Sequence, residues 1–430
     1  MSFRPSRSFL ICLVALATAG ASGFWIWSRL RSVPAHKLWS AASFNALFLP
    51  RESENISFPT EKDRVRNRAA TEALIHKIWD EYPELKTENH PVPDAENGFL
   101  QFYQFSQEHD SIKSPTLMEL QRFLGANRWD PEEAKRLLSQ NADSVARIEA
   151  IAALNRRSTA NMSDDYTGFI GARSMKFAAE VLMLKARLAA EVHDEPEALR
   201  LAKAALNLCT HLRQVEAPNL LGETVVILLD LSIANTIFQH VLPALGRDAD
   251  LAQWKAALNL RTYGAADFAQ VMRGEWENTM RYYLFPVLVD RSNRNRPKDA
   301  DEFARVTSFH YCAFITRLRG MSLAEMPKDP GIAVPGDLKK MSAKSREIYD
   351  ILMIGSRAWS KGYQRASVKM ALFQAGLDLL ILEKEGTKLT PDSTGNVTHD
   401  PLAEKPFDFD PATRTLTTTT KDIEPLKLPF

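Results

Sequence analysis

The chain has 430 residues, of which 45% are hydrophobic and 25% are charged. This is the composition of a folded globular protein of one or two domains, and it excludes disorder as the main state. Lysine and arginine (54 together) nearly balance aspartate and glutamate (53 together). No global excess of charge therefore draws the protein to nucleic acid or to anionic lipid, and any partner must be bound by a local site.

The N-terminal segment carries the strongest signal. Residues 9–27 contain no charge, and a helix of that length spans about 30 Å, the thickness of the hydrocarbon core of a bilayer. The sequence predicts a membrane anchor, or uncleaved signal sequence, over residues 1–28 and a tether over residues 29–60. A cleaved signal peptide is the alternative, because the small residues around Ala19 and Ala21 fit a signal peptidase site.

The end of the apolar run favours the anchor over cleavage, because Trp25 and Trp27 suit a membrane–water interface better than a mature N-terminus. Basic residues flank the run on both sides, so the positive-inside rule is nearly balanced. The short basic stretch before the run resembles the layout of exported signal anchors. We expect a single-pass membrane protein whose body lies outside the cytoplasm and whose N-terminal segment contacts membrane lipid.

Prolines mark the centre of the chain as helical. Nine of the 23 prolines lie at or before Pro131 and eleven lie at or after Pro286. Because proline breaks helix interiors, the near absence of proline between them predicts long helices. We place an α-helical body at residues 61–385. The fold class is mainly α, with helical hairpins stacked as a bundle or a short irregular solenoid.

Several helix starts are marked by capping residues. Thr60 resembles the N-cap of a first body helix, and Ser114 and Asp130 each precede a first-turn proline. The apolar face of the first helix comprises Ile75, Ile78, Trp79 and Tyr82.

The stretch 175–212 predicts an antiparallel helix pair that turns at residues 193–196. This pair resembles a tetratricopeptide repeat, because small residues stand where the two helices of that motif pack closely: Ala186, Ala189, Ala198, Ala202 and Ala205. The motif does not recur at the same period, since Ser232 stands where a second equivalent of Ala198 belongs. An extended solenoid with a peptide groove is therefore disfavoured.

The rest of the body predicts further helices at residues 220–240, 251–260, 265–283 (ending before Pro286) and 301–319. The polar, arginine-rich residues 290–298 predict a solvated connection. Helical pattern returns at residues 338–385, as one helix or as two around Gly362.

Residues 386–430 predict a tail with a short β-hairpin. Phe407 and Phe409 alternate with aspartate, so on a strand both phenylalanines face one side. An isolated hairpin is marginal in water, and we expect this face to dock on the apolar segment 370–382. On this view Phe407→Ala destabilises the protein more than truncation before Thr417.

The anchor, the helical centre and the tail stretch 400–407 (DPLAEKPF) together resemble an uncharacterised bacterial family of membrane-anchored helical proteins. Members of that family often end in a DPF-x-G-KP-L-x-Y hairpin. Leu402, Glu404 and Phe409 replace the Phe, Gly and Tyr of this pattern, and the usual Gly-Tyr-Pro stretch after the long helix is absent from this sequence. The resemblance implies a fold and brings no known activity.

The recognisable catalytic motifs are absent from the sequence: the P-loop, the Rossmann glycine fingerprint, H-E-x-x-H, G-x-S-x-G and the kinase set. The nearest candidates for chemistry are His109 with Asp110, Glu275 and Glu277 around Trp276, and His310 beside Cys312.

Each candidate has a structural interpretation that we favour. The pair at residues 109–110 ends an aromatic helix. Glu275 and Glu277 face different sides of a helix, with Glu275 available for ion pairs to Arg273 or Arg281. His310 and Cys312 point away from each other on a helix. We assign no catalytic, cofactor-binding or metal-ligating residue, and we predict no cofactor.

The three cysteines, Cys12, Cys209 and Cys312, have no zinc-ligand spacing. Cys209 and Cys312 are able to pair only if the body faces an oxidising compartment, and buried free thiols are the commoner outcome in helices.

The leading hypothesis is a membrane-anchored interaction or scaffold protein of the bacterial envelope, whose partner is another envelope protein. The alternative is an enzyme or small-ligand binder with a site assembled between helices.

Overall fold

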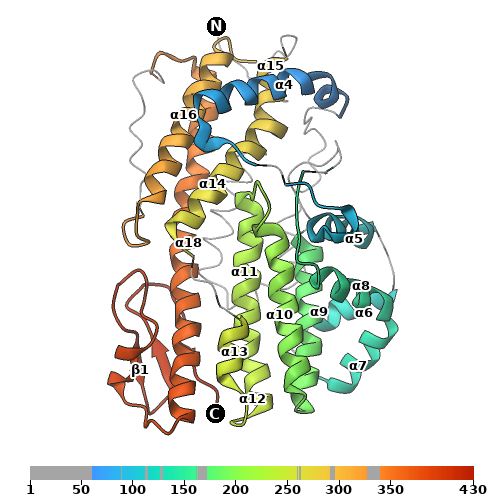
Figure 1. Ribbon diagram of the computed structural model, residues 1–430, viewed down its shortest axis with the longest axis vertical. Helices are drawn as coiled ribbons and strands as arrows, with labels where there is room; N and C mark the ends of the chain where they lie inside the picture. Colours follow the sequence, from blue (N-terminus) through green and yellow to red (C-terminus); the bar gives the residue numbers. More distant parts are fainter. Residues whose placement is uncertain are drawn as a thin grey trace, which may run out of the picture.

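Figure 1 shows a computed structural model that describes residues 61–430 except 89, 112–114, 126–128, 161, 163–171, 259, 261–262, 291–295 and 327–338. The predicted anchor (residues 1–28) and tether (residues 29–60) lie outside the described residues. The described chain is mainly helical and ends in a small antiparallel sheet. This confirms the mainly α fold class of the body.

The helices in chain order have the following bounds. They are α4 (Glu61–Glu81), α5 (Gly98–Ser111), α6 (Pro115–Gly125), α7 (Pro131–Gln140), α8 (Ala142–Ala152), α9 (Ala172–Glu191), α10 (Glu195–Arg213), α11 (Leu220–Thr236), α12 (Leu242–Leu245), α13 (Leu251–Leu258), α14 (Ala265–Thr279), α15 (Phe285–Val289), α16 (Ala300–Arg319) and α18 (Ala343–Lys384). The 3-10 turns η1 (Pro83–Leu85) and η2 (Asp94–Glu96) connect α4 to α5, and η5 (Pro391–Asn396) follows α18.

Helices α9, α10 and α11 lie side by side in the middle of the molecule, and α5 to α8 flank them (Figure 1). Helices α4, α14, α15 and α16 gather at one end. Helix α18 runs from that end to the C-terminal sheet at the other. The buried apolar side chains of all these elements form one continuous core.

The predicted helix starts agree with the structure. Helix α6 begins at Pro115 and α7 at Pro131. Asp130 caps α7, because its Oδ1 accepts a hydrogen bond from the backbone N–H of Glu133 at 3.1 Å. In α4, Ile75, Ile78 and Trp79 are buried as the helical spacing predicts.

The antiparallel pair predicted for residues 175–212 is formed by α9 and α10. The chain turns at His193, whose φ is 57°, and Asp194 caps α10 through the backbone N–H of Glu197 at 3.2 Å. The side chains of Ala186, Ala198, Ala202 and Ala205 are fully buried, which is the close helix approach expected from small residues.

The prediction that a helix ends before Pro286 is wrong. Helix α14 passes through the π-helical turn η4 (Met280–Leu284) into α15, which contains Pro286. A π-helical turn also joins α11 to α12, where η3 (Ile237–Val241) precedes Pro243. Proline lacks an N–H and clashes with the carbonyl four residues earlier, and a π turn changes the local bonding pattern so that the helix continues.

Helix α18 is continuous over 42 residues, so Gly362 does not divide it. Glycine in a helix interior is only mildly unfavourable, and packing of the adjacent Tyr363, which is buried, outweighs that penalty. Further along, a Cβ atom built on Gly376 would lie 2.9 Å from Leu426 and 3.0 Å from Phe238. The missing side chain at Gly376 is therefore what lets the tail approach α18.

The tail has three strands and not the predicted two. Strand β1 (Asp408–Asp410) pairs antiparallel with β2 (Thr415–Thr417), as predicted, and β2 also pairs with β3 (Leu426–Lys427). Phe409 stands opposite Leu416, and Leu416 opposite Leu426, so the three form one buried row. Phe407 is buried as well. The sheet packs on α18 around Gly376, inside the predicted segment 370–382.

Among the described residues, the helical run Leu220–Leu245 is long and apolar enough to cross a bilayer by length and composition. Its most apolar window is 61% buried inside the protein. The run also carries two buried acidic side chains, Glu223 and Asp230, which have partners in the core. These features are those of a central core helix.

Candidate functional site

The most buried group of charged side chains lies where α10, α11 and the start of α14 meet. Arg213 ends α10 and donates through Nε to both oxygens of Glu223 at 3.2 Å, through Nη1 to Asp230 Oδ2 at 2.8 Å, and through Nη2 to the Tyr263 hydroxyl at 2.9 Å. Tyr263 in turn donates to Asp230 Oδ2 at 2.7 Å. We call these four residues the Arg213 cluster.

Local sequence explains how the Arg213 cluster assembles. Glu223 and Asp230 lie seven residues apart on α11, so they share one face of the helix. Arg213 stands in the last turn of α10, the helix end that favours a cation. Its guanidinium also lies 4.8 Å from the centre of the Tyr263 ring, and that ring packs edge-on against Tyr363 of α18 at 5.2 Å. The cluster therefore ties three segments to α18.

Electrostatics hold the cluster in one protonation state. Burial alone would lower the pKa of Arg213, but Glu223, Tyr263 and Asp230 raise it well above its ordinary value. Burial and the charge of Asp230 raise the pKa of Tyr263 and of the neighbouring Cys209 thiol. Neither the phenol nor the thiol supplies an anion at neutral pH, so the arrangement serves to join helices.

Sequence reasoning missed the Arg213 cluster, although a signal was present. Glu223 and Asp230 are the two acidic residues in the otherwise uncharged stretch 220–240. Acidic side chains on an apolar helix imply a buried partner. The partner itself comes from a different helix, and the sequence does not identify it.

A second polar group joins α4 to α14. Glu277 accepts hydrogen bonds from Arg281 at 3.0 Å and from the hydroxyl of Thr87. Arg281 also pairs with Glu72 of α4, and its guanidinium lies 5.9 Å from the centre of the Trp79 ring. These contacts cross between segments about 200 residues apart in the chain.

The predicted ion pair of Glu275 with Arg273 or Arg281 is wrong, because Glu277 takes Arg281. Glu275 accepts from the backbone N–H of Leu220 at 2.9 Å and from the Thr279 hydroxyl at 3.0 Å. It thus places a carboxyl group at the positive N-terminus of α11. Burial raises its pKa. As predicted, Glu275 and Glu277 do not form a carboxylate pair.

His310 and Cys312 point to different neighbours, as predicted. The Nδ1 of His310 bonds the Tyr349 hydroxyl, whereas Cys312 Sγ lies 3.4 Å from Glu84 Oε2. Burial lowers the pKa of His310 to about 4, and burial with Glu84 raises the pKa of Cys312 to about 11.

Cys209 and Cys312 are both free thiols and do not form a disulfide. His109 and Asp110 lie in the last turn of α5, and their side chains are outside the described part of the structure.

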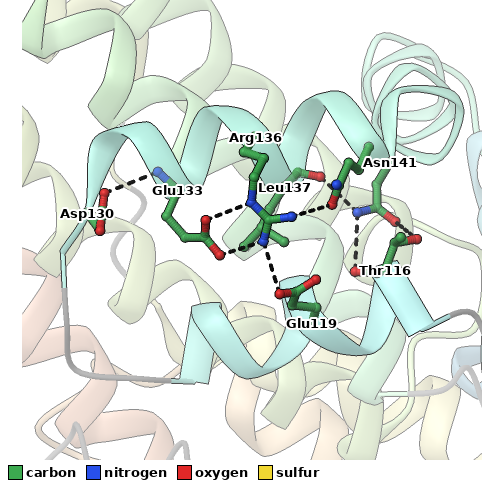
Figure 2. Close-up of polar contacts among 8 residues, drawn as sticks. Thr116, Glu119, Asp130, Glu133, Arg136, Leu137 and Asn141 are labelled. Atoms are coloured by element: carbon green, nitrogen blue, oxygen red, sulfur yellow. Dashed lines mark hydrogen bonds and ion pairs between the residues drawn. The ribbon is translucent and has the colours of Figure 1, made fainter.

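Figure 2 shows a peripheral polar network between α6 and α7. Arg136 donates to Glu133 at 2.6 and 2.7 Å, to Glu119 at 3.0 Å and to Gln140 at 3.0 Å. Asn141 binds the carbonyl of Leu137 at 2.8 Å and also contacts Thr116. Every guanidinium nitrogen of Arg136 has an acceptor, and the network pins the two helices together.

Within the described residues, no group of three or more histidine, cysteine, aspartate or glutamate side chains is placed to hold a metal ion. No family model matches this chain, and neither the curated proteins nor the solved structures contain a significant match to it. The resemblance to the uncharacterised bacterial family therefore stays a prediction.

Proposed function

We propose that this protein is a helical scaffold of the bacterial envelope, anchored by its N-terminal apolar segment, whose body binds another envelope protein. The proposal rests on the buried charged side chains, which bond to one another across helices. The Arg213 cluster joins α10 to α11, and Arg281 joins the turn η4 to α4 through Glu72. Such a body holds a fixed shape, which a binding surface needs.

The state of the other reactive side chains also favours a scaffold. A general base works best with a pKa near the operating pH, and a thiol nucleophile needs a lowered pKa. The pKa of His310 is lowered to about 4 and that of Cys312 is raised to about 11. Both shifts move the group away from a catalytic role at neutral pH.

The α9–α10 pair supports the proposal because paired helices with small residues at their contact are the building unit of tetratricopeptide scaffolds. We propose that this pair is a single repeat-like unit within an irregular stack of hairpins. Its exposed faces, together with those of neighbouring helices, then contact the partner.

Two measurements test the proposal. After alkaline washing of membranes we expect the protein in the pellet, because residues 9–27 bury an apolar helix in lipid. Crosslinking in native membranes, followed by mass spectrometry, should then recover a defined envelope protein. Release into the soluble fraction with a new N-terminus near Ala21 would contradict the anchor, and recovery of uncrosslinked protein alone would contradict the scaffold.

A specific observation favours small-ligand binding as the second candidate function. Thr307 and His310 are fully buried on one face of α16, three residues apart, and neither Thr307 Oγ1 nor His310 Nε2 has a hydrogen-bond partner. Unsatisfied buried polar atoms are rare and call for an explanation. Native mass spectrometry of the full chain should then detect a bound small molecule that is lost in His310→Gln. A ligand-free spectrum would remove this candidate.

A further inference from the structure

Three stretches of the chain meet at the end of the body where α4, α16 and α18 begin. Arg66 of α4 pairs with Asp290, directly after α15, at 2.9 Å, and α15 packs against α16. Asp299 accepts hydrogen bonds from the backbone N–H and the hydroxyl of Ser342 at 2.8 and 2.9 Å, which joins the start of α16 to that of α18. We call residues 65–70, 296–302 and 339–346, at the upper end of Figure 1, the basic end.

Exposed side chains on the basic end are mostly cationic. Six arginines and lysines among its described side chains are exposed: Arg66, Arg68, Lys298, Lys339, Lys340 and Arg346. Two acidic side chains there are exposed as well, Asp301 and Glu302. Because the whole chain carries a formal charge of only +1, the surplus of cations at this end is a local feature that attracts anions.

The first turns of α4 lie outside the core. Within residues 65–70 no described side chain is buried, and burial along α4 begins at Thr71. Val65 is 56% exposed and stands three residues before Arg68, so an apolar and a basic side chain share one exposed helix face. A helix face of this kind suits the surface of an anionic bilayer.

We propose that the basic end binds the headgroups of anionic phospholipids in the membrane that holds the anchor. This inference rests on the proposed anchor, because the tether of residues 29–60 joins that anchor to α4. A tether keeps the basic end at a high effective concentration near the bilayer. Phosphate oxygens accept hydrogen bonds from guanidinium and ammonium groups. The C-terminal sheet, at the other end of α18, then points away from the membrane.

The test measures how fast lysines are acetylated in the full-length protein. The protein is inserted through its anchor into nanodiscs of phosphatidylcholine, alone or mixed with phosphatidylglycerol, and acetylation is followed by peptide mass spectrometry. In the anionic discs we expect Lys298, Lys339 and Lys340 to react more slowly, by about threefold or more. Sodium chloride at about 0.5 M should remove the difference, because salt screens the attraction.

The exposed lysines around the C-terminal sheet are internal controls and should react equally fast in both kinds of nanodisc: Lys388, Lys405 and Lys421. The double variant Lys339→Glu, Lys340→Glu should abolish the protection of Lys298. Its matched control, Lys388→Glu with Lys405→Glu, reverses the same charge at the other end and should retain that protection.

Equal rates at the basic end in the two lipids, or equal slowing of the control lysines, would overturn the lipid contact and leave the anchor in place. Slowing in native membranes but not in anionic nanodiscs would assign the basic end to an acidic protein instead, and would also overturn the proposal. A chain that does not enter nanodiscs at all would contradict the anchor and the lipid contact together.

Discussion

The centre of the molecule and its C-terminal tail are held by different forces. In the centre, alanines bring α9 and α10 into close contact and the Arg213 cluster fixes α10, α11 and Tyr263 with directional bonds. In the tail, a row of three apolar side chains and Phe407 pack on α18. The buried Asp400 accepts hydrogen bonds from Thr418 and Thr420 within the tail, and the ion pair of Arg414 with Glu383 is partly exposed. A directional buried network fails as a unit, whereas an apolar contact weakens in proportion to the area lost.

The largest effect should come from Ala198→Asp in the centre. The substitution places an unpaired carboxylate in a fully buried helix contact that has no room for it. We expect a loss of about 5 kcal/mol in the free energy of unfolding, measured by denaturant titration. Lys203→Asp, at an exposed position of the same helix, is the control. Equal stability of the two variants would show that α9 and α10 do not pack as described.

Arg213→Met should have the second largest effect, a loss of about 4 kcal/mol in the free energy of unfolding. The substitution leaves Glu223 and Asp230 buried without the cation that joins them. The triple variant Arg213→Met, Glu223→Gln, Asp230→Asn removes the stranded charges and should recover part of the loss. A single variant as stable as the wild type would mean that the cluster adds nothing to the centre.

Acid should weaken the centre through His211, whose pKa burial lowers from 6.5 to about 4. Below pH 6.5 the unfolded chain binds a proton that the folded chain accepts only near pH 4. Stability is therefore full above pH 6.5 and falls towards pH 4, by about 3 kcal/mol at most. Melting curves across this range should show a smaller dependence of the melting temperature on pH for His211→Gln than for the wild type.

Phe407→Ala should lower stability by about 2 to 3 kcal/mol, since the side chain is 2% exposed. The structure reverses the expectation that truncation before Thr417 matters less, because Leu426 and Leu428 of the removed segment are buried against α18. Hydrogen exchange should show both changes opening residues 400–430 while α10 and α11 stay protected. Full exposure of residues 400–420 in the intact protein would rule out a docked tail.

Arg414→Gln should have the smallest effect, about 1 kcal/mol. Arg414 pairs with both oxygens of Glu383 at 2.7 Å, but the two side chains are 26% and 33% exposed. Salt should reduce the difference between this variant and the wild type. A loss as large as that of Phe407→Ala would mean that charge, and not apolar packing, holds the tail.

Local signals predicted the elements well, and tertiary contacts account for what they missed. Asp130 marks a helix start by its own chemistry, and the alanines of α9 and α10 predict a close contact. The predictions at Pro286 and Gly362 were wrong, because local rules place proline and glycine at helix ends. A π turn lets the helix continue through Pro286, and the buried Tyr363 stabilises the helix at Gly362. The third strand has only two residues and no pattern of its own.

The polar sites show the same limit more strongly. Spacing on one helix correctly separated Glu275 from Glu277 and His310 from Cys312. The spacing did not predict the hydrogen bond of Arg213 with Asp230 or that of Glu275 with the backbone of Leu220, because these bonds join different helices. Partner choice between helices depends on the fold and not on the local sequence.

The late position of α18 in the chain has a consequence for biosynthesis. Phe238 and Tyr263 are covered by Phe373 and Tyr363, ring to ring at 5.2 Å in each case. About 100 residues separate Tyr263 from Tyr363, and ribosomes add about 5 to 20 residues per second. Tyr263 therefore waits roughly 5 to 20 s after its own synthesis for its cover, and during that time the nascent chain is the natural client of a chaperone.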